Sequence, residues 1–263
     1  MTKLHGAWIW YELMTPDATG AKAFYEAVVG WHITPGTDAP LFYGHIANAD
    51  GGDTGGILPL SADMLAGGAH PGWLGYIGVE DVDAAVAAIV ARGGRVIMPK
   101  MTIPVGSFAL LTDPGGAAFY VMTPQMPEGM EDQPSTAFST SLPGRCSWNE
   151  LHAASDTAAI AFYGEVFGWT VPDAMDMGPF GTYHFLAHED GGIGAVMTKA
   201  PHIPVPNWTH YFRVPSIAAA CSAIAAHDGQ IIHGPQEVPG GDWIINGIDP
   251  QGAAFALVGQ KGE

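Results

Sequence analysis

One pattern of apolar and polar positions occurs twice along the chain. Residues 7–14 are apolar or aromatic except for Glu12, which is typical of a buried strand. Thr15 as the N-cap and Pro16 in the first turn predict a helix that ends at Gly30. The second half repeats this order around Glu150. Three pairs of residues keep a constant spacing: Glu12 and Glu150, Phe24 and Phe162, and Trp31 and Trp169. The sequence therefore predicts one structural unit used twice.

A second kind of unit follows the first within each half. Residues 73–79 predict a strand, Asp81 opens an apolar helix, and a hairpin turns at the Asp-Pro-Gly-Gly that begins at Asp113. In the second half, residues 208–214 match that strand, and the Asp-Pro-Gln-Gly at Asp249 matches the turn. We therefore expect an α+β protein of four βαβββ modules.

The modules are expected to pair into two domains, at residues 1–123 and 146–263. Residues 124–145 separate the two repeats, contain several prolines and show no periodicity. This composition is typical of a linker.

Composition excludes several classes of partner. The chain has 263 residues and a net charge of −17, so phosphate backbones and anionic lipids would be repelled. No apolar run is long enough to span a membrane, and the first residues lack the pattern of a signal peptide. The two cysteines do not form a disulfide framework. We expect a cytoplasmic protein that binds neither nucleic acid nor membranes.

The ordered set of motifs carries a family resemblance. A Trp-x-Glu-Leu strand, a helix with Phe24-Tyr25, a Gly-Trp ending, a second strand and helix, and a closing Asp-Pro-x-Gly hairpin occur in both halves. This set resembles the vicinal oxygen chelate superfamily, the group of glyoxalase I, extradiol dioxygenases and bleomycin-resistance proteins. It is most similar to a tandem-domain, glyoxalase-like subfamily. The resemblance implies two glyoxalase-like domains, each with a curved sheet around a cleft, a small organic molecule as the ligand, and a monomer or homodimer.

The resemblance also gives the positions at which metal-binding members carry their ligands. None of the residues at these positions is a strong ligand for a divalent metal. We therefore expect the common metal site to be absent and no cofactor to be bound, although a divalent metal at a non-standard site built from Glu150, His152 and a neighbour stays open. The residues at the ligand positions are Trp10 and Trp148, Leu74 and Thr209, and Tyr120 and Ala256.

Strand alternation predicts which other side chains share the inward face. Glu150 and His152 follow Trp148 at two-residue steps, as Tyr211 and Arg213 follow Thr209. Carboxylate and imidazole groups are suited to proton transfer, phenol to hydrogen bonding, and guanidinium to holding an anion. Glu150, His152 and Tyr211 are thus candidate catalytic residues, and six others are candidates for substrate binding. These are Trp148, Arg213, Thr209, Glu12, Tyr76 and Trp10.

A purely structural explanation of the same residues also stays open. An inward Glu and an inward Tyr in each half could form a buried hydrogen bond that closes two modules together. Arg213 could form a salt bridge with Glu150, and His152 could be a satisfied core histidine. Leaving such groups buried and unpaired would cost roughly 1–3 kcal/mol each, so pairing is expected without any catalysis.

The functional hypothesis is an enzyme of the vicinal oxygen chelate type without the usual metal ligands. It would perform lyase, isomerase or hydrolase chemistry by general acid–base steps in an aromatic-walled cleft of the second domain. One alternative is a non-catalytic binding protein for a drug or metabolite, of the bleomycin-resistance type. The other is a metal-dependent glyoxalase or dioxygenase with a non-standard site.

Overall fold

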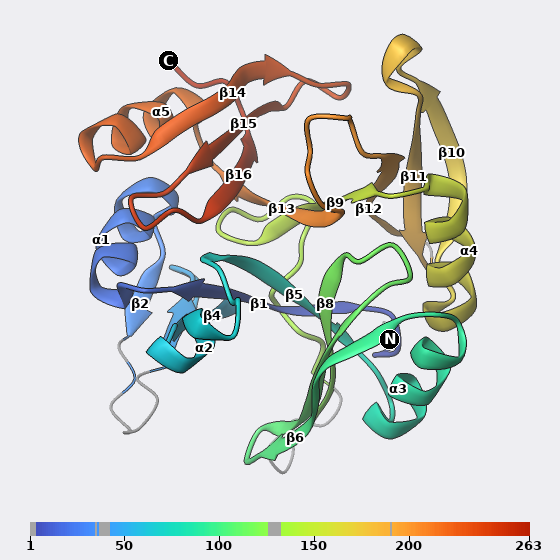
Figure 1. Ribbon diagram of the computed structural model, residues 1–263. Helices are drawn as coiled ribbons and strands as arrows, with labels where there is room; N and C mark the ends of the chain where they lie inside the picture. Colours follow the sequence, from blue (N-terminus) through green and yellow to red (C-terminus); the bar gives the residue numbers. More distant parts are fainter. Residues whose placement is uncertain (1–3, 35, 37–42, 126–132, 190) are drawn as a thin grey trace. The chain divides into compact units, whose positions relative to one another are not determined.

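The computed structural model describes residues 4–34, 36, 43–125, 133–189 and 191–263. Within these residues the strands form two eight-stranded sheets, and helices are few (Figure 1). The predicted α+β class is therefore confirmed. In the part of the chain that is described, no helix is both long and apolar enough to cross a lipid bilayer.

The first half of the sequence forms one sheet, which we call sheet A. Its strand order is β2-β3-β4-β1-β5-β8-β7-β6. β1 pairs in parallel with β4, and β5 in parallel with β8, so each module closes on its own first strand. The elements are β1 (Trp8–Thr15), α1 (Ala18–Val29), β2 (His32–Thr34), β3 (Gly44–Ala47), β4 (Asp53–Pro59), α2 (Ala62–Ala66), β5 (Gly72–Gly78), α3 (Val82–Ala91), β6 (Arg95–Ile103), β7 (Gly106–Thr112) and β8 (Ala118–Pro124).

The second half forms sheet B with the same topology. Its order, β10-β11-β12-β9-β13-β16-β15-β14, repeats that of sheet A strand for strand. The internal repeat inferred from the sequence is thus present in the fold. Each half contains two βαβββ modules, which makes four in all. The elements are β9 (Cys146–Ala153), α4 (Asp156–Phe167), β10 (Thr170–Asp176), the 3-10 helix η1 (Gly178–Phe180), β11 (Thr182–His188), β12 (Gly191–Thr198), β13 (Asn207–Val214), α5 (Ile217–Ala226), β14 (Gln230–Glu237), β15 (Trp243–Ile248) and β16 (Ala254–Gly259).

The ends of α1 show one correct and one wrong prediction. Gly30 ends the helix in the left-handed conformation (φ 83°), as glycine at this position does most easily. The cap at the other end is Asp17, whose side chain accepts hydrogen bonds from Thr19 N and Gly20 N, and the prediction of Thr15 was wrong. Thr15 is instead the buried last residue of β1, which leaves the carboxylate of Asp17 to reach the free amides of the first turn.

Packing divides the chain into two compact units, and each unit draws on both halves of the sequence. Unit 1 comprises Met1–Ile9, Gly75–Ser135 and Trp148–Thr209, and unit 2 comprises Trp10–Leu74, Thr136–Ser147 and His210–Glu263. In unit 1 α3 contacts α4, and in unit 2 α1 contacts α5 (Figure 1). The predicted domains, residues 1–123 and 146–263, follow the repeat and the two sheets. That each of these segments is a domain stays a prediction.

The same three-residue hydrogen-bonded group occurs in each unit. In unit 2, Tyr25 accepts a hydrogen bond from Trp73 and donates one to Asp249. In unit 1, Tyr163 accepts from Trp208 and donates to Asp113. Each tyrosine is on the first helix of its half, whereas the aspartate is in the closing hairpin of the other half. The repeated hairpin motif therefore joins the two halves within each unit.

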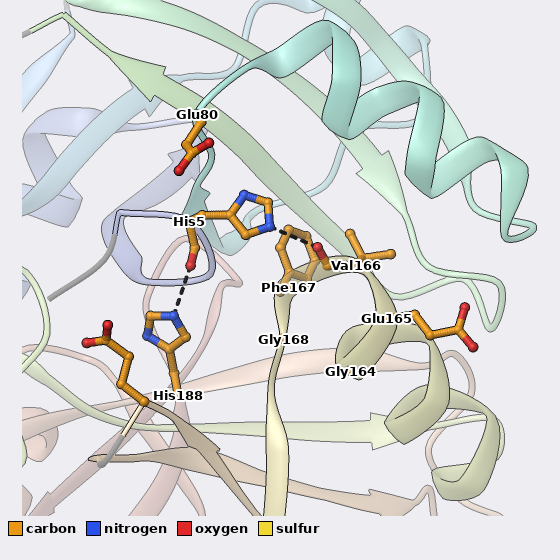
Figure 2. Close-up of a pocket in the computed structure, with 9 residues that line it drawn as sticks. His5, Glu80, Gly164, Glu165, Val166, Phe167, Gly168 and His188 are labelled. Atoms are coloured by element: carbon orange, nitrogen blue, oxygen red, sulfur yellow. Dashed lines mark hydrogen bonds between the residues drawn. The ribbon is translucent and has the colours of Figure 1, made fainter.

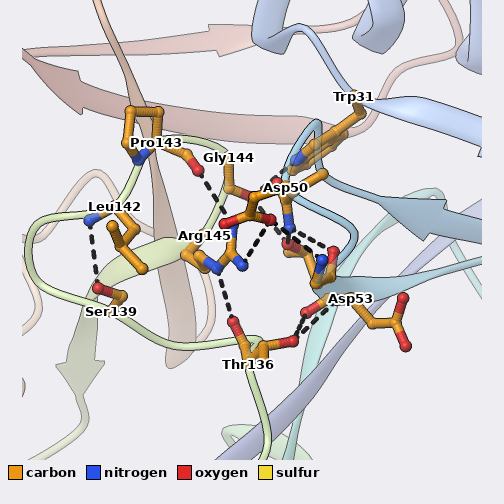
Figure 3. Close-up of polar contacts among 12 residues, drawn as sticks. Trp31, Asp50, Asp53, Thr136, Ser139, Leu142, Pro143, Gly144 and Arg145 are labelled. Carbon is orange, nitrogen blue, oxygen red and sulfur yellow. Dashed lines mark hydrogen bonds and ion pairs between the residues drawn. The ribbon is translucent and has the colours of Figure 1, made fainter.

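The end of the predicted linker is a packed segment in unit 2 (Figure 3). The buried Arg145 donates from Nε to the Thr136 carbonyl oxygen at 3.0 Å and from Nη2 to Asp50 Oδ1 at 2.9 Å. Trp31 Nε1 donates to the Gly144 carbonyl oxygen at 2.7 Å. Residues 126–132 of the predicted linker lie outside the described part of the chain.

Candidate functional site

Strand β9 places three of the predicted site residues on one face of sheet B. Trp148, Glu150 and His152 alternate with the buried Asn149 and Leu151. β12 runs parallel beside β9, with Ala195 opposite Glu150 and Met197 opposite His152. The alternation expected from the sequence thus brings the indole, carboxylate and imidazole groups together in unit 1.

This face is the one turned away from helix α4. His184 Nε2 of β11 lies 3.4 Å from the carboxylate of Asp156, in the first turn of α4, so the His184 side chain faces the helix. Its neighbours Tyr183 and Phe185 therefore face the opposite side. They meet the residues of β9 there, because Tyr183 hydrogen-bonds to both Trp148 and Glu150.

Four polar side chains form one continuous series on this face. Trp148 Nε1 donates to the Tyr183 hydroxyl at 2.8 Å, and that hydroxyl donates to Glu150 Oε2 at 2.6 Å. The other carboxylate oxygen, Oε1, lies 3.0 Å from His152 Nε2. The Glu150 and His152 side chains are 14% and 18% exposed, so both are mostly removed from water. We call this group the Glu150–His152 series; its members are Trp148, Tyr183, Glu150 and His152.

Two neighbouring side chains fix the carboxylate. Glu150 Oε2 accepts from the Tyr183 hydroxyl, and Oε1 lies beside His152 Nε2. When His152 carries its hydrogen on Nε2, it donates to Glu150, and Nδ1 is then the ring acceptor. Nδ1 is buried without a hydrogen-bond partner among the described residues. In the other tautomer, with the hydrogen on Nδ1, Nε2 is the ring acceptor that faces Glu150 Oε1.

Tyr183 was missed by the sequence analysis. Strand alternation on β9 gives no information about which residue of another strand reaches Glu150. A usable signal was the repeat itself, since the first half has a matching tyrosine at the start of its third strand, Tyr43. The two tyrosines make the same contact, because Trp10 Nε1 donates to the Tyr43 hydroxyl at 2.7 Å.

The first half carries this arrangement without the histidine. Glu12 is buried in β1 opposite Gly56, and a Cβ atom at Gly56 would lie 2.3 Å from the Tyr43 hydroxyl, so the tyrosine ring covers that glycine. Met14 occupies the position equivalent to His152. The first half thus has the Trp–Tyr pair and the buried glutamate with a methionine in place of His152, and its imidazole on this face, His45, lies beside Trp10 instead, with ring centroids 5.6 Å apart.

Three further predicted site residues are placed in other contacts. Tyr76 in unit 1 is buried and stacks on Tyr120 with ring centroids 4.1 Å apart. Thr209, also in unit 1, accepts from Asn207 Nδ2 at 3.3 Å. Tyr211 belongs to unit 2, where its hydroxyl accepts from Asn246 Nδ2 at 3.3 Å.

Arg213 was expected either to anchor a substrate anion or to pair with Glu150. In unit 2 its guanidinium forms a two-point ion pair with Asp242, at 2.5 Å and 3.2 Å, and also donates to Ser147 Oγ at 3.2 Å. The hydrogen bond from Arg213 lowers the pKa of Asp242, so the aspartate stays ionised. The positive charge of Arg213 is therefore matched by a carboxylate of the protein itself.

The residues at the superfamily's metal-ligand positions do not fit a divalent metal. The indole of Trp148 donates a hydrogen bond there, and an indole N–H has no lone pair for a metal. Tyr120 is stacked on Tyr76. Among the described residues, no group of three or more His, Cys, Asp or Glu side chains is arranged to hold a metal ion. We derive no chemical step through a metal.

A hollow lies in unit 1, at the C-terminal end of α4 (Figure 2). Its volume is about 630 Å³, and its lining includes His5, Glu80, Glu165 and His188. His5 Nε2 donates to the Val166 carbonyl oxygen, and His188 Nε2 donates to the His5 carbonyl oxygen, each at 2.9 Å. These bonds hold the start of the chain against the helix end, and none of the predicted site residues lines the hollow.

Sequence comparisons agree with this architecture. CFP32 of Mycobacterium tuberculosis, provisionally named a glyoxylase, is 33% identical over 255 residues, which cover 95% of this chain and 93% of CFP32. The anthracycline biosynthesis protein DnrV of Streptomyces peucetius is 28% identical, over 96% of this chain and 93% of its own length.

Solved structures share the fold at low sequence identity. The Mn(II)-bound glyoxalase of Novosphingobium aromaticivorans aligns with a TM-score of 0.62 at 17% identity, over 98% of this chain and 83% of that one. The 2,3-dioxygenase LapB of Pseudomonas sp. KL28 aligns with a TM-score of 0.66 at 14% identity, over 97% and 93% of the two chains.

A family model covers most of both halves. The model of the glyoxalase/bleomycin resistance protein/dioxygenase superfamily matches residues 9–121 and 151–257. These two segments coincide with the two repeats, and the unmatched residues between them contain the predicted linker. The chain belongs to the glyoxalase/bleomycin resistance protein/dioxygenase superfamily.

Proposed function

We propose that the Glu150–His152 series transfers protons to and from a small organic molecule by general acid–base catalysis. The reaction class is that of a lyase, isomerase or hydrolase. The observation that carries the proposal is the contact of 3.0 Å between Glu150 Oε1 and His152 Nε2, on a carboxylate that Tyr183 holds from the other side. The first half has the glutamate and the tyrosine but lacks the histidine.

In this mechanism Glu150 accepts a proton from a C–H or O–H group of the substrate. Tyr183 and His152 hold the two carboxylate oxygens, so the carboxylate keeps one orientation toward the substrate. In the tautomer with the ring hydrogen on Nδ1, His152 Nε2 accepts that proton from Glu150 Oε1 and later gives it back, and Glu150 then returns it to a different atom of the substrate. Positioned proton transfer of this kind typically contributes about 10²–10⁴-fold in rate.

The relatives support the substrate class in broad outline. DnrV is named for the biosynthesis of anthracyclines, and CFP32 is provisionally named a glyoxylase. Both names concern small organic molecules, which is the class expected from the superfamily. Two rival functions, a binding protein and a metal enzyme with a non-standard site, differ from the proposal in measurable ways.

The test uses compounds captured from a metabolite extract by the purified protein and identified by mass spectrometry. Each captured compound is incubated with the protein in D₂O, and deuterium incorporation or conversion is followed by NMR. We expect turnover that falls at least about 100-fold in Glu150→Gln and in His152→Ala, because each removes one half of the proton-exchange pair. His184→Ala, which removes a histidine on the opposite face of the same sheet, is expected to keep wild-type turnover.

Two results would contradict the proposal. Turnover that is unchanged in both Glu150→Gln and His152→Ala would remove the Glu150–His152 series from catalysis. Tight binding of the captured compound with no conversion would favour the binding protein. Elemental analysis of protein purified without added metal completes the test, since a stoichiometric transition metal would favour the metal enzyme.

A further inference from the structure

We propose that the face carrying the Glu150–His152 series accepts a flat aromatic compound without an anionic group. This inference rests on the proposed function only for the location of the site. It concerns the shape and charge of the substrate, which the acid–base pair does not define. Two independent features of strands β9 to β12 carry it: the apolar side chains of the face and the lack of cations in the four strands.

Aromatic and thioether groups surround the acid–base pair. Phe185 lies edge-on to both Trp148 and Tyr183, with ring centroids 6.1 Å and 5.5 Å away. Met175 pairs with Tyr183, and Met197 with His152, so strand register places both thioethers on this same face. Trp148, Phe185 and the two methionines are all partly exposed.

Partly exposed rings and thioethers suit a flat aromatic ligand. Contact of an aromatic ring with Trp148 and Phe185, edge-on or stacked, contributes binding free energy beyond that of the buried area. Methionine is flexible and polarisable, so Met175 and Met197 can adapt to the edge of a ring. A small aliphatic substrate would leave most of these side chains uncovered.

The charges in the same strands exclude an anionic ligand. β9, β10, β11 and β12 contain no lysine or arginine, whereas they contain Glu150, Asp173 and Asp176. The imidazole of His152 already faces the Glu150 carboxylate, so it offers no separate partner for an anion. An anion here would lose water without gaining a countercharge, which is strongly unfavourable. The net charge of −17 acts in the same direction.

The first half shows that this composition is not imposed by the fold. His45 occupies the position two residues after Tyr43, as Phe185 does after Tyr183. His45 Nε2 lies 3.4 Å from Asp53 Oδ1, so a polar pair replaces the aromatic ring. Phe185 therefore distinguishes the second half from the first, and it is the residue with which we test the inference.

The test measures binding of two probes that share one ring system. 2-(Hydroxymethyl)anthraquinone is uncharged, and anthraquinone-2-sulfonate is anionic. Isothermal titration calorimetry on the full chain is expected to show that the uncharged probe binds at least about tenfold more tightly. Phe185→Leu keeps an apolar side chain but removes the ring, and it should weaken binding of the uncharged probe about tenfold. His45→Leu, the matched change in the first half, should leave that binding unchanged.

A second variant tests the charge argument separately. Met197→Arg places a cation on the face, so binding of the sulfonate should tighten about tenfold.

Equal or tighter binding of the sulfonate by the wild type, no binding of the uncharged probe, or no effect of Phe185→Leu would each overturn the inference. Probe binding requires no proton transfer, so it is measured independently of whether the protein converts any captured compound. The experiments therefore distinguish a failure of the proposed catalysis from a failure of this inference.

Discussion

Tyr183 shows how one hydroxyl group can organise a site. It accepts a hydrogen bond from Trp148 and donates one to Glu150, so the indole, the phenol and the carboxylate are fixed together. Asp113 and Asp249 show the same use of a tyrosine for a structural purpose, since each accepts from a buried tyrosine of the other half of the chain. Similar groups thus serve the candidate site and the core.

The buried Asp113 should make stability depend on pH in an unusual direction. Burial raises its pKa, although the amides of Ala117 and Gly116 and the Tyr163 hydroxyl partly oppose this. A carboxyl group with a raised pKa in the folded state stabilises the fold most at low pH, and this contribution is lost as the pH rises through the folded pKa. Urea unfolding of the wild type and of Asp113→Asn should therefore show that the wild type's advantage shrinks between pH 4 and pH 7.

Asp50 provides the control with the opposite sign. Its hydrogen bond with Arg145 lowers its pKa, so its contribution is present at neutral pH and is lost as the pH falls. The advantage of the wild type over Asp50→Asn should grow as the pH rises from 2 to 5, the range at and below the ordinary carboxyl pKa. The same pH dependence for both variants would show that burial does not govern the titration of Asp113.

At the scale of elements, several hydrogen bonds hold the end of the linker. Gly144 accepts hydrogen bonds from Trp31 Nε1 and from Thr54 Oγ1, and its own amide donates to the Arg213 carbonyl oxygen. Arg145 then joins this segment to the turn that carries Asp50 (Figure 3). Proline-rich composition predicted an irregular segment, but it contained no information about these contacts.

Replacing Arg145 should destabilise the protein because its guanidinium is buried and donates to several oxygens. Arg145→Met leaves the Thr136 carbonyl oxygen without its donor, and we expect a loss of about 2 kcal/mol in the free energy of unfolding. Arg92→Met removes an exposed ion pair with Glu165 and should cost less than about 1 kcal/mol. Urea denaturation of both variants measures the difference, and equal losses would contradict a structural role for Arg145.

At the scale of the whole molecule, the two halves of the sequence are interdependent. Phe24 of the first half packs against Phe255 of the second in unit 2, and Phe119 packs against Tyr163 in unit 1. All four side chains are buried. A half produced alone would expose these rings, and it would leave the carboxylate of its closing hairpin without the tyrosine of the other half.

We therefore expect residues 1–123 and 146–263, produced separately, not to fold as monomers. Mixing the two fragments should restore a complex with a cooperative thermal transition, because each supplies the partners that the other lacks. Size-exclusion chromatography and circular dichroism of the fragments, alone and mixed, measure this. Two stable folded monomers would show instead that each half is an autonomous domain. Chromatography of the full chain also distinguishes the predicted monomer and homodimer.

The sequence by itself determined the repeat, the four modules and the residues that share a face of each first strand. These features depend on local order, such as strand alternation and helix ends, and local order is written directly in residue spacing. Tertiary structure alone decided that Tyr183 holds Glu150, that Asp242 neutralises Arg213, and that each hairpin aspartate meets a tyrosine of the other half. These partners lie tens to hundreds of residues apart, and packing of the strands and helices, rather than spacing along the chain, brings them together.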